Sequence, residues 1–205
     1  MMWIMLRPNY LQSTKKKIES APFGSVFVAS DLAEIAETKR INECLGQLAK
    51  ENLIQRIMRG VYYKPEYSEL LGEYTDPSPN AVAQAVARNF GWTIIPCGDT
   101  ALNILGLSTQ VPAVWSYVSD GPYKKYSFGK TIITFKHITN KEITRLSPKT
   151  ALIIQALKAL GKENITTEIK SRIQSITSDV EKQMMLVEAK YATTWIYEII
   201  KELCR

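Results

Sequence analysis

Histidine and cysteine are scarce in this sequence of 205 residues, which restricts the chemistry available to it. His137 is the single histidine, so multi-histidine metal sites are excluded and His-based nucleophilic catalysis would depend on this one residue. Its place in an alternating segment favours a hydrogen-bonded histidine beside a core. The three cysteines, Cys44, Cys97 and Cys204, form no C-x-x-C pair, which favours buried free thiols over a disulfide framework or a zinc site. We therefore expect neither a metal nor a cofactor.

Long hydrophobic runs are also missing. No run approaches the roughly 18 apolar residues of a membrane-spanning helix. The apolar start "MWIML" is too short for a secretory signal and follows no charged segment. We expect a cytoplasmic protein without a membrane partner. The apolar fraction of 45% is enough to build real cores, in one large domain or in a small module joined to a larger one.

Motifs that bind phosphates or catalytic metals are absent or incomplete. The sequence has no G-x-x-x-x-G-K-[ST] loop and no G-x-G-x-x-G fingerprint. The segment "CGDT" lacks the Gly-Ser and paired acids of polymerase-type nucleotidyltransferases. A nuclease would need an Asp on one strand and E-x-K on the next to hold Mg²⁺. Residues 168–170 and 188–190 match E-x-K, but both lie in helical patterns. An enzyme is therefore the less favoured reading.

Positive charge is in excess, and it is unevenly distributed. The chain has 26 Lys and Arg against 20 Asp and Glu, which gives a net charge of +6 and favours an anionic partner. Residues 1–64 hold 10 of these cations and 6 of the acids, whereas residues 65–205 hold 16 and 14. The shorter segment thus carries most of the excess.

The first segment has the pattern of a winged helix-turn-helix. We expect a basic helix capped by Ser13, a strand at 26–28, a second helix capped by Ser30 and a third helix over 38–52. Residues 53–64 then read as a hairpin that turns at 58–60. Three helices and a two-stranded ribbon predict a DNA-binding domain over residues 1–75.

The third predicted helix has one apolar face and one polar face, and arginines flank the turn of the hairpin. Lys and Arg suit phosphates, while the amides of Asn and Gln suit adenine edges. For the helix face, an ordinary solvated surface is the alternative. The candidate DNA-contacting residues are Lys15, Lys16, Lys17, Lys39, Arg40, Asn42, Gln47, Lys50, Arg56 and Arg59.

The acidic, Pro-rich segment "EYTDPSPN" marks a domain boundary near Asp76. Beyond it, a small-residue helix ending at Gly91, several strands and a helix opened by Ser147 and Pro148 predict a small α+β domain over 76–205. Further helices form a tail that we expect to break near Tyr191. The fold class is therefore α+β.

Several segments carry a resemblance to a known family. They are "FGSVFVASDL", "RGVYYKP", "GLSTQVPAVWSYVSDGPYKKYSFGKTIITFKH" and "ALIIQALKALGKENIT". On them the chain resembles the AbiEi-type abortive-infection antitoxins, and most closely a bacterial branch of uncharacterised proteins related to them. The resemblance runs from about Ser13 to the C-terminus, and "LGLSTQVP" is its most specific part.

The resemblance implies a bacterial phage-defence protein of a toxin-antitoxin system. In that family an N-terminal winged helix binds inverted repeats in the operon's own promoter as a transcriptional repressor. A C-terminal domain neutralises a nucleotidyltransferase toxin encoded beside it. The helix at 38–52 would then be the recognition helix and residues 53–65 the wing. An inverted repeat would need two protomers, as a homodimer or through cooperative binding.

The antitoxin surface is the least defined part of this reading. It is assigned to Gly106, Leu107, Thr109, Gln110 and Pro112, and the favoured alternative is a tight loop that seats a helix on the sheet. For the chain as a whole, the alternative is a winged-helix protein-interaction module, or a regulator with no antitoxin role.

Overall fold

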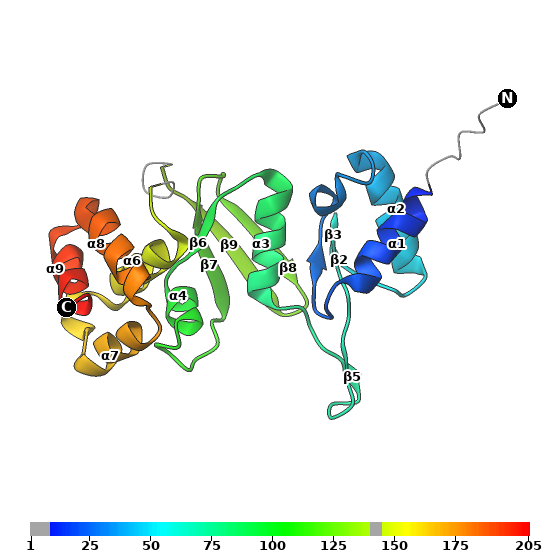
Figure 1. The fold of residues 1–205 in the computed structure, drawn as a ribbon. Coiled ribbons are helices and arrows are strands. Elements are labelled where there is room, and N and C mark those ends of the chain that lie inside the picture. Colours follow the sequence, from blue (N-terminus) through cyan, green and yellow to red (C-terminus); the bar gives the residue numbers. More distant parts are fainter. Residues whose placement is uncertain (1–8, 140–144) are drawn as a thin grey trace. The chain divides into compact units, whose positions relative to one another are not determined.

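A computed structural model describes residues 9–139 and 145–205. The apolar segment "MWIML" near the N-terminus lies outside the described residues. The chain forms two compact units, one ending at Gly91 and one running from Trp92 to Arg205 (Figure 1).

The first unit has N-terminal helices and a small sheet in the order predicted for a winged helix-turn-helix, except for its second helix. It has the helices α1 (Tyr10–Ser20) and α2 (Thr38–Lys50), the 3-10 helix η1 (Ala29–Leu32), and the strands β1 (Val26–Phe27), β2 (Gln55–Met58) and β3 (Val61–Tyr63). The strands form an antiparallel sheet in the order β1-β3-β2. Apolar side chains from both helices, η1 and the sheet pack into one core, which includes Ile18, Leu32, Ile41, Leu45, Leu48 and Tyr62.

The second predicted helix is the main local difference. Only a short 3-10 helix forms, and the Asp31 carboxylate accepts a hydrogen bond of 3.0 Å from the Val28 N–H. Val28, rather than Ser30, is the N-cap of η1, and this bond satisfies its backbone donor as the acidic side chain of a capping box does. Helix α1 begins at Tyr10 and is capped by Asn9 rather than by Ser13. Strand β2 begins at Gln55 rather than at residue 53, after a left-handed turn at Asn52 (φ 59°).

Residues 66–91 add a second hairpin and a helix to this unit. The hairpin pairs β4 (Tyr67–Ser68) with β5 (Glu73–Tyr74), and α3 (Pro79–Phe90) ends at Gly91 in the left-handed conformation (φ 68°). Helix α3 contacts η1, β1 and β3. The compact unit therefore extends past the boundary expected near Asp76, and the predicted linker contains β5 and the start of α3.

The second unit is built on a four-stranded mixed sheet in the order β6-β7-β9-β8. Its strands are β6 (Ile94–Pro96), β7 (Val114–Ser119), β8 (Lys124–Phe128) and β9 (Thr131–His137). Strands β7 and β9 are parallel, and the other two pairs are antiparallel. Helix α4 (Asp99–Ile104) contacts β7, and α6 (Pro148–Leu160) contacts β6. As predicted, Ser147 caps α6 and Pro148 occupies its first turn.

The C-terminal helices form the remaining part of the unit. They are α7 (Thr167–Ser175), α8 (Asp179–Glu188) and α9 (Thr194–Leu203), and the expected break near Tyr191 is the 3-10 helix η3 (Ala189–Tyr191). Their apolar faces share a core with α4 and α6.

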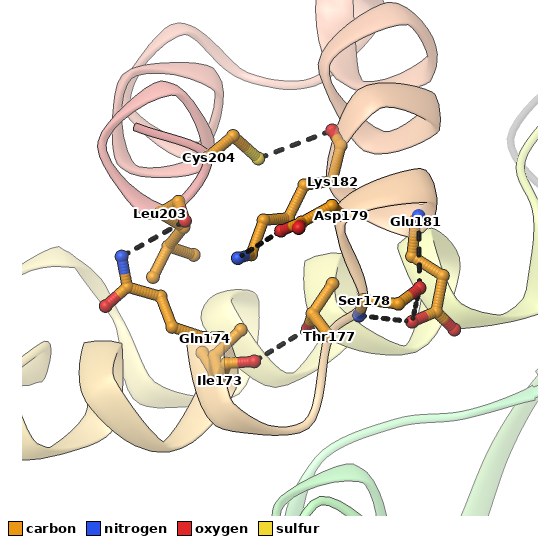
Figure 2. A network of polar contacts seen from close by, with 9 residues as sticks. All are labelled: Ile173, Gln174, Thr177, Ser178, Asp179, Glu181, Lys182, Leu203 and Cys204. Carbon is orange, nitrogen blue, oxygen red and sulfur yellow. Dashed lines mark hydrogen bonds and ion pairs between the residues drawn. The ribbon is translucent and has the colours of Figure 1, made fainter.

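Polar contacts tie these helices together at their ends (Figure 2). The amide of Gln174 on α7 donates to the Leu203 carbonyl oxygen on α9 at 3.1 Å. Ser178 caps α8, and the Cys204 thiol reaches the Lys182 carbonyl oxygen of α8 at 3.4 Å. No helix in the described ranges is long and apolar enough to span a bilayer.

Candidate nucleic-acid interface

Helix α2 is strongly amphipathic, with one buried apolar face and one exposed polar face. Ile41, Cys44, Leu45 and Leu48 recur at helical spacing and are buried, which fixes the rotation of the helix on the core. The predicted contact residues on this helix, Lys39, Arg40, Asn42, Gln47 and Lys50, are all exposed. The packing of the apolar face thus turns every one of them toward solvent.

One side of α2 faces the β2–β3 hairpin across a hollow. Asn42 lies on this side, and Arg56 and Arg59 of the hairpin line the same hollow. Thr38, at the start of α2, lines this hollow as well. The full lining is Thr38, Asn42, Arg56, Arg59, Gly60, Tyr62, Asn89 and Phe90. An amide able to read a base edge and two guanidinium groups able to contact phosphates therefore lie together.

The hairpin turn contributes two arginines to the lining of this hollow. The register slips between Arg56 and Met58, and Gly60 takes a positive φ of 76° that allows the tight return into β3. The Arg56 Nε–H donates to the Met58 carbonyl oxygen at 3.4 Å, which leaves the guanidinium end for another partner. Both side chains are exposed.

A second hollow, beside Arg56, runs along the later turns of α2. It is lined by Gly46, Ala49 and Lys50 of the helix and by Gln55 and Arg56 of the hairpin, among others. Apart from its chain neighbours and the backbone of its own helix, nothing lies within 4 Å of the place that a Cβ on Gly46 would occupy. The absent side chain therefore leaves the helix surface open to close approach at this point.

The opposite side of α2 is occupied by internal pairs. Arg40 forms an ion pair of 2.8 Å with Glu43, and the Gln47 amide donates to Glu51 at 3.2 Å. These residues border a separate hollow beside the start of α1. Asn42 and Lys50 thus border the hollows beside the hairpin, Arg40 and Gln47 lie toward α1 beside carboxylates, and Lys39 lines none of these hollows.

The three lysines of α1 are likewise not equivalent. Lys15 is half-buried, whereas Lys16 and Lys17 are exposed. The Lys17 ammonium lies 3.2 Å from the Glu34 carboxylate. Backbone hydrogen bonding at Glu34 and the Lys17 hydrogen bond together hold the pKa of that carboxyl below its usual range. None of the three lines the hollow between α2 and the hairpin.

Sequence reasoning missed the contribution of α3 to this surface. Asn89 and Phe90 line the hollow although they lie beyond the expected domain boundary. Arg88 docks this end of α3 by a two-pronged ion pair with Asp31 at 2.7 and 3.1 Å. The Asp31 carboxylate raises the pKa of Arg88. No local sequence pattern predicts this ion pair, because Asp31 and Arg88 lie far apart in the sequence.

Charge in the first unit is also distributed differently from what the sequence count indicated. Up to Gly91, 11 Lys and Arg face 10 Asp and Glu, because the hairpin at residues 66–76 brings four acids and no base. From Trp92 onward the counts are 15 and 10. The positive character of the first unit is therefore local to α1, α2 and the β2–β3 hairpin.

The segment assigned to an antitoxin surface forms a hydrogen-bonded loop after α4. The Leu107 N–H donates to the Leu102 carbonyl oxygen at 2.8 Å, and the Asn103 amide donates to the Gln110 carbonyl oxygen at 2.9 Å. Leu107 packs on the helical core and Pro112 is buried, while Gly106, Thr109 and Gln110 are exposed. Gly106 has a φ of 65°, and a Cβ there would lie 2.7 Å from the Arg172 guanidinium.

The other residues that the sequence offered for catalysis or metal binding are His137, the two E-x-K segments and the cysteines. The His137 Nδ1 lies 2.9 Å from the Gly121 carbonyl oxygen, so this nitrogen carries the proton and donates. Residues 168–170 lie in α7, and residues 188–190 join α8 to η3. Cys44 and Cys97 are buried free thiols, and burial raises the pKa of Cys97. Within the described ranges, no cluster of three His, Cys, Asp or Glu side chains could hold a metal ion.

Comparison with curated proteins gives no match to this chain. A protein-family model does match, over residues 13–185, which runs from α1 into α8 and covers most of both units. The chain belongs to DUF6088, a family of unknown function.

Proposed function

We propose that this protein is a DNA-binding antitoxin that represses the promoter of its own operon. The observation that supports DNA binding is the convergence of Asn42, Arg56 and Arg59 on one hollow of a winged helix-turn-helix. Helix α2 would enter the major groove, and the β2–β3 hairpin would lie over the adjacent phosphates.

Each group in the hollow has a distinct task in this proposal. Arg56 and Arg59 neutralise phosphates and release condensed counterions, which makes affinity dependent on salt. Asn42 offers a donor and an acceptor side by side, which matches the major-groove edge of adenine. Lys39 and Lys50, both exposed on the same helix, add phosphate contacts at its two ends.

The antitoxin role is supported by the resemblance to AbiEi-type antitoxins. Under this proposal the second unit counteracts a nucleotidyltransferase toxin encoded by the neighbouring gene, and the protein itself is not an enzyme. The two roles are separable, because the first concerns α2 and the β2–β3 hairpin, whereas the second concerns residues from Trp92 onward.

A salt titration of DNA binding tests the first role. Fluorescence anisotropy would be measured with a labelled duplex taken from upstream of the gene, between 50 and 200 mM salt. We expect the double variant Arg56→Ala, Arg59→Ala to bind at least about tenfold more weakly. It should also reduce the slope of log affinity against log salt by about 2, since each lost phosphate contact removes about 0.9 from the slope.

The matched control is the double variant Lys17→Ala, Arg40→Ala. It removes the same charge from the same unit, but both side chains are paired with glutamates away from the hollow. We expect its affinity and its salt slope to stay close to those of the native protein. Equal losses in both double variants would show that net charge, not the hollow, drives binding. If neither the native protein nor the variants bind the duplex, the alternative of a protein-interaction module is favoured.

Coexpression tests the antitoxin role. Cells expressing the neighbouring nucleotidyltransferase should stop growing, and coexpression of the Arg56→Ala, Arg59→Ala variant should restore growth as well as the native protein does. Expression from a foreign promoter keeps repression out of the assay. Absence of a toxic nucleotidyltransferase gene beside this one, or failure to restore growth, would leave only the regulatory role.

A further inference from the structure

The β4–β5 hairpin is an ordered projection with an unusual surface. The Gly72 N–H donates to the Ser68 carbonyl oxygen, and the Thr75 N–H donates to the Glu66 carbonyl oxygen, both at 2.8 Å. Tyr67 and Tyr74 face each other across the two strands, with ring centroids 5.3 Å apart in an edge-to-face arrangement. The hairpin therefore has a defined shape that a partner could recognise.

Its side chains combine exposed apolar groups with negative charge. Leu70 and Leu71, at the tip, are 94% and 63% exposed, and both tyrosines are more than half exposed. Residues 66–76 carry four acids and no Lys or Arg, namely Glu66, Glu69, Glu73 and Asp76. Contiguous exposed apolar groups of this size are typical of interaction sites. Four carboxylates disfavour DNA as the partner, since phosphates would repel them.

A groove with the opposite charge lies on the sheet of the second unit. It is lined by Val114, Ser116, Tyr123, Lys124, Lys125, Thr134, Phe135 and Lys136. Val114 is 39% exposed and Tyr123 is 71% exposed, so apolar surface is open to solvent there. Three lysines and no acid belong to this lining, and β8 is an edge strand of the sheet.

We propose that the β4–β5 hairpin of one molecule docks into this groove of a second copy of the chain. Leu70 and Leu71 would bury their side chains against Val114 and Tyr123, while the hairpin's carboxylates meet the groove's lysines. Every molecule carries both surfaces, so a two-fold axis would make the contact reciprocal and close the assembly as a dimer. The inference does not depend on DNA binding or on a toxin.

Charge-reversal variants, analysed by sedimentation velocity without DNA, test the proposal. We expect the native protein to form dimers as its concentration rises. Glu69→Lys with Glu73→Lys on the hairpin, or Lys124→Glu with Lys125→Glu in the groove, should each weaken dimerisation at least about tenfold, because like charges then face each other.

Mixing the two variants gives the decisive measurement. In a mixed dimer one contact joins the two native surfaces and the other joins the two reversed surfaces, so both are complementary again. An equimolar mixture should therefore recover dimers that neither variant forms alone. The control Lys158→Glu, Lys162→Glu makes the same charge change at exposed residues of the second unit outside this groove, and it should dimerise like the native protein.

Four results would overturn the proposal. The first is a native protein that stays monomeric even at about 100 µM, where a dimer of micromolar affinity would form. The second is a dimer that neither charge reversal weakens. The third is an equimolar mixture of the two variants that stays monomeric. The circular dichroism spectrum and melting temperature of each variant verify that it is folded. A monomer whose hairpin crosslinks to the groove within one chain also contradicts the inference, because the occupant would then not be a second copy.

Discussion

The Glu188 carboxylate joins the end of α8 to the start of α6. It accepts hydrogen bonds from the Ser147 N–H at 2.9 Å and from the Ser147 hydroxyl at 2.8 Å. Partial burial by itself raises the pKa of Glu188, but hydrogen bonding from Thr150 and from Ser147 outweighs it, and the pKa lies below its ordinary value. A carboxyl whose pKa is lower in the folded state stabilises the fold above the unfolded pKa. That stability is lost as the pH falls through the folded pKa.

We therefore predict a pH-dependent effect of Glu188→Gln. At pH 7 the variant should be less stable by about 1–2 kcal/mol, the scale of hydrogen bonds to a partly exposed charged group. The difference in stability should shrink below about pH 4, where the native Glu188 carboxyl becomes protonated and, like the Gln side chain, carries no charge. Thermal unfolding across a pH series measures it. Glu163→Gln, at an exposed position, is the control, and a gap that does not change with pH would contradict the assignment.

At the scale of elements, α3 completes the winged helix. Its Arg88 binds Asp31 of η1 with two nitrogens and also donates to the Val26 carbonyl oxygen at 3.2 Å. Asp31 in turn accepts from the Val28 N–H. One carboxylate thus fixes both the turn into η1 and the end of α3. This contact places Asn89 beside the hollow that α2 and the β2–β3 hairpin form.

This arrangement predicts different behaviour for two fragments of the chain. A fragment ending at Gly91 should fold and bind DNA with the salt slope of the full chain. A fragment ending at Asp76 keeps α1, α2 and both hairpins but loses α3, so it should unfold at a lower temperature and bind more weakly. Circular dichroism melting and anisotropy provide the comparison. Equal stability of the two fragments would show that α3 is not part of the folded core.

At the scale of the whole molecule, the charges of the two units take on different roles. In the first unit, most Lys and Arg belong to α1, α2 and the β2–β3 hairpin, while residues 66–76 carry four of its ten acids and no base. The second unit has the larger excess of cations, with 15 against 10 acids. A dimer built through the β4–β5 hairpin would hold two copies of α2 in one particle. Such a particle suits an inverted repeat, if the proposed function holds.

Local patterns predicted the regular elements well, because their signals lie within a few residues. The i, i+3, i+4, i+7 spacing of Ile41, Cys44, Leu45 and Leu48 was enough to place α2 and its buried face. Ser147 with Pro148 placed the start of α6, and Gly91 placed the end of α3. The same patterns were wrong at η1, which is a short 3-10 helix with Val28 as its N-cap and not a longer helix capped by Ser30.

The candidate site was only partly readable in the same way. Helical periodicity predicts that Asn42 is exposed on α2, and the predicted hairpin turn between Arg56 and Arg59 named those two arginines. The sequence could not separate them from Arg40 and Gln47, because the pairing of those two with Glu43 and Glu51 depends on side-chain geometry. It also could not find Asn89, whose position depends on an ion pair between distant residues.

The sequence by itself determined most of the helices and strands, the buried face of α2 and the α+β class, since these follow from patterns among near neighbours. Only the tertiary structure decided which polar side chains share a hollow, where the first unit ends and which apolar groups stay exposed at Leu70 and Leu71. These features depend on contacts between segments far apart in the chain. Such contacts leave no periodic trace in the sequence.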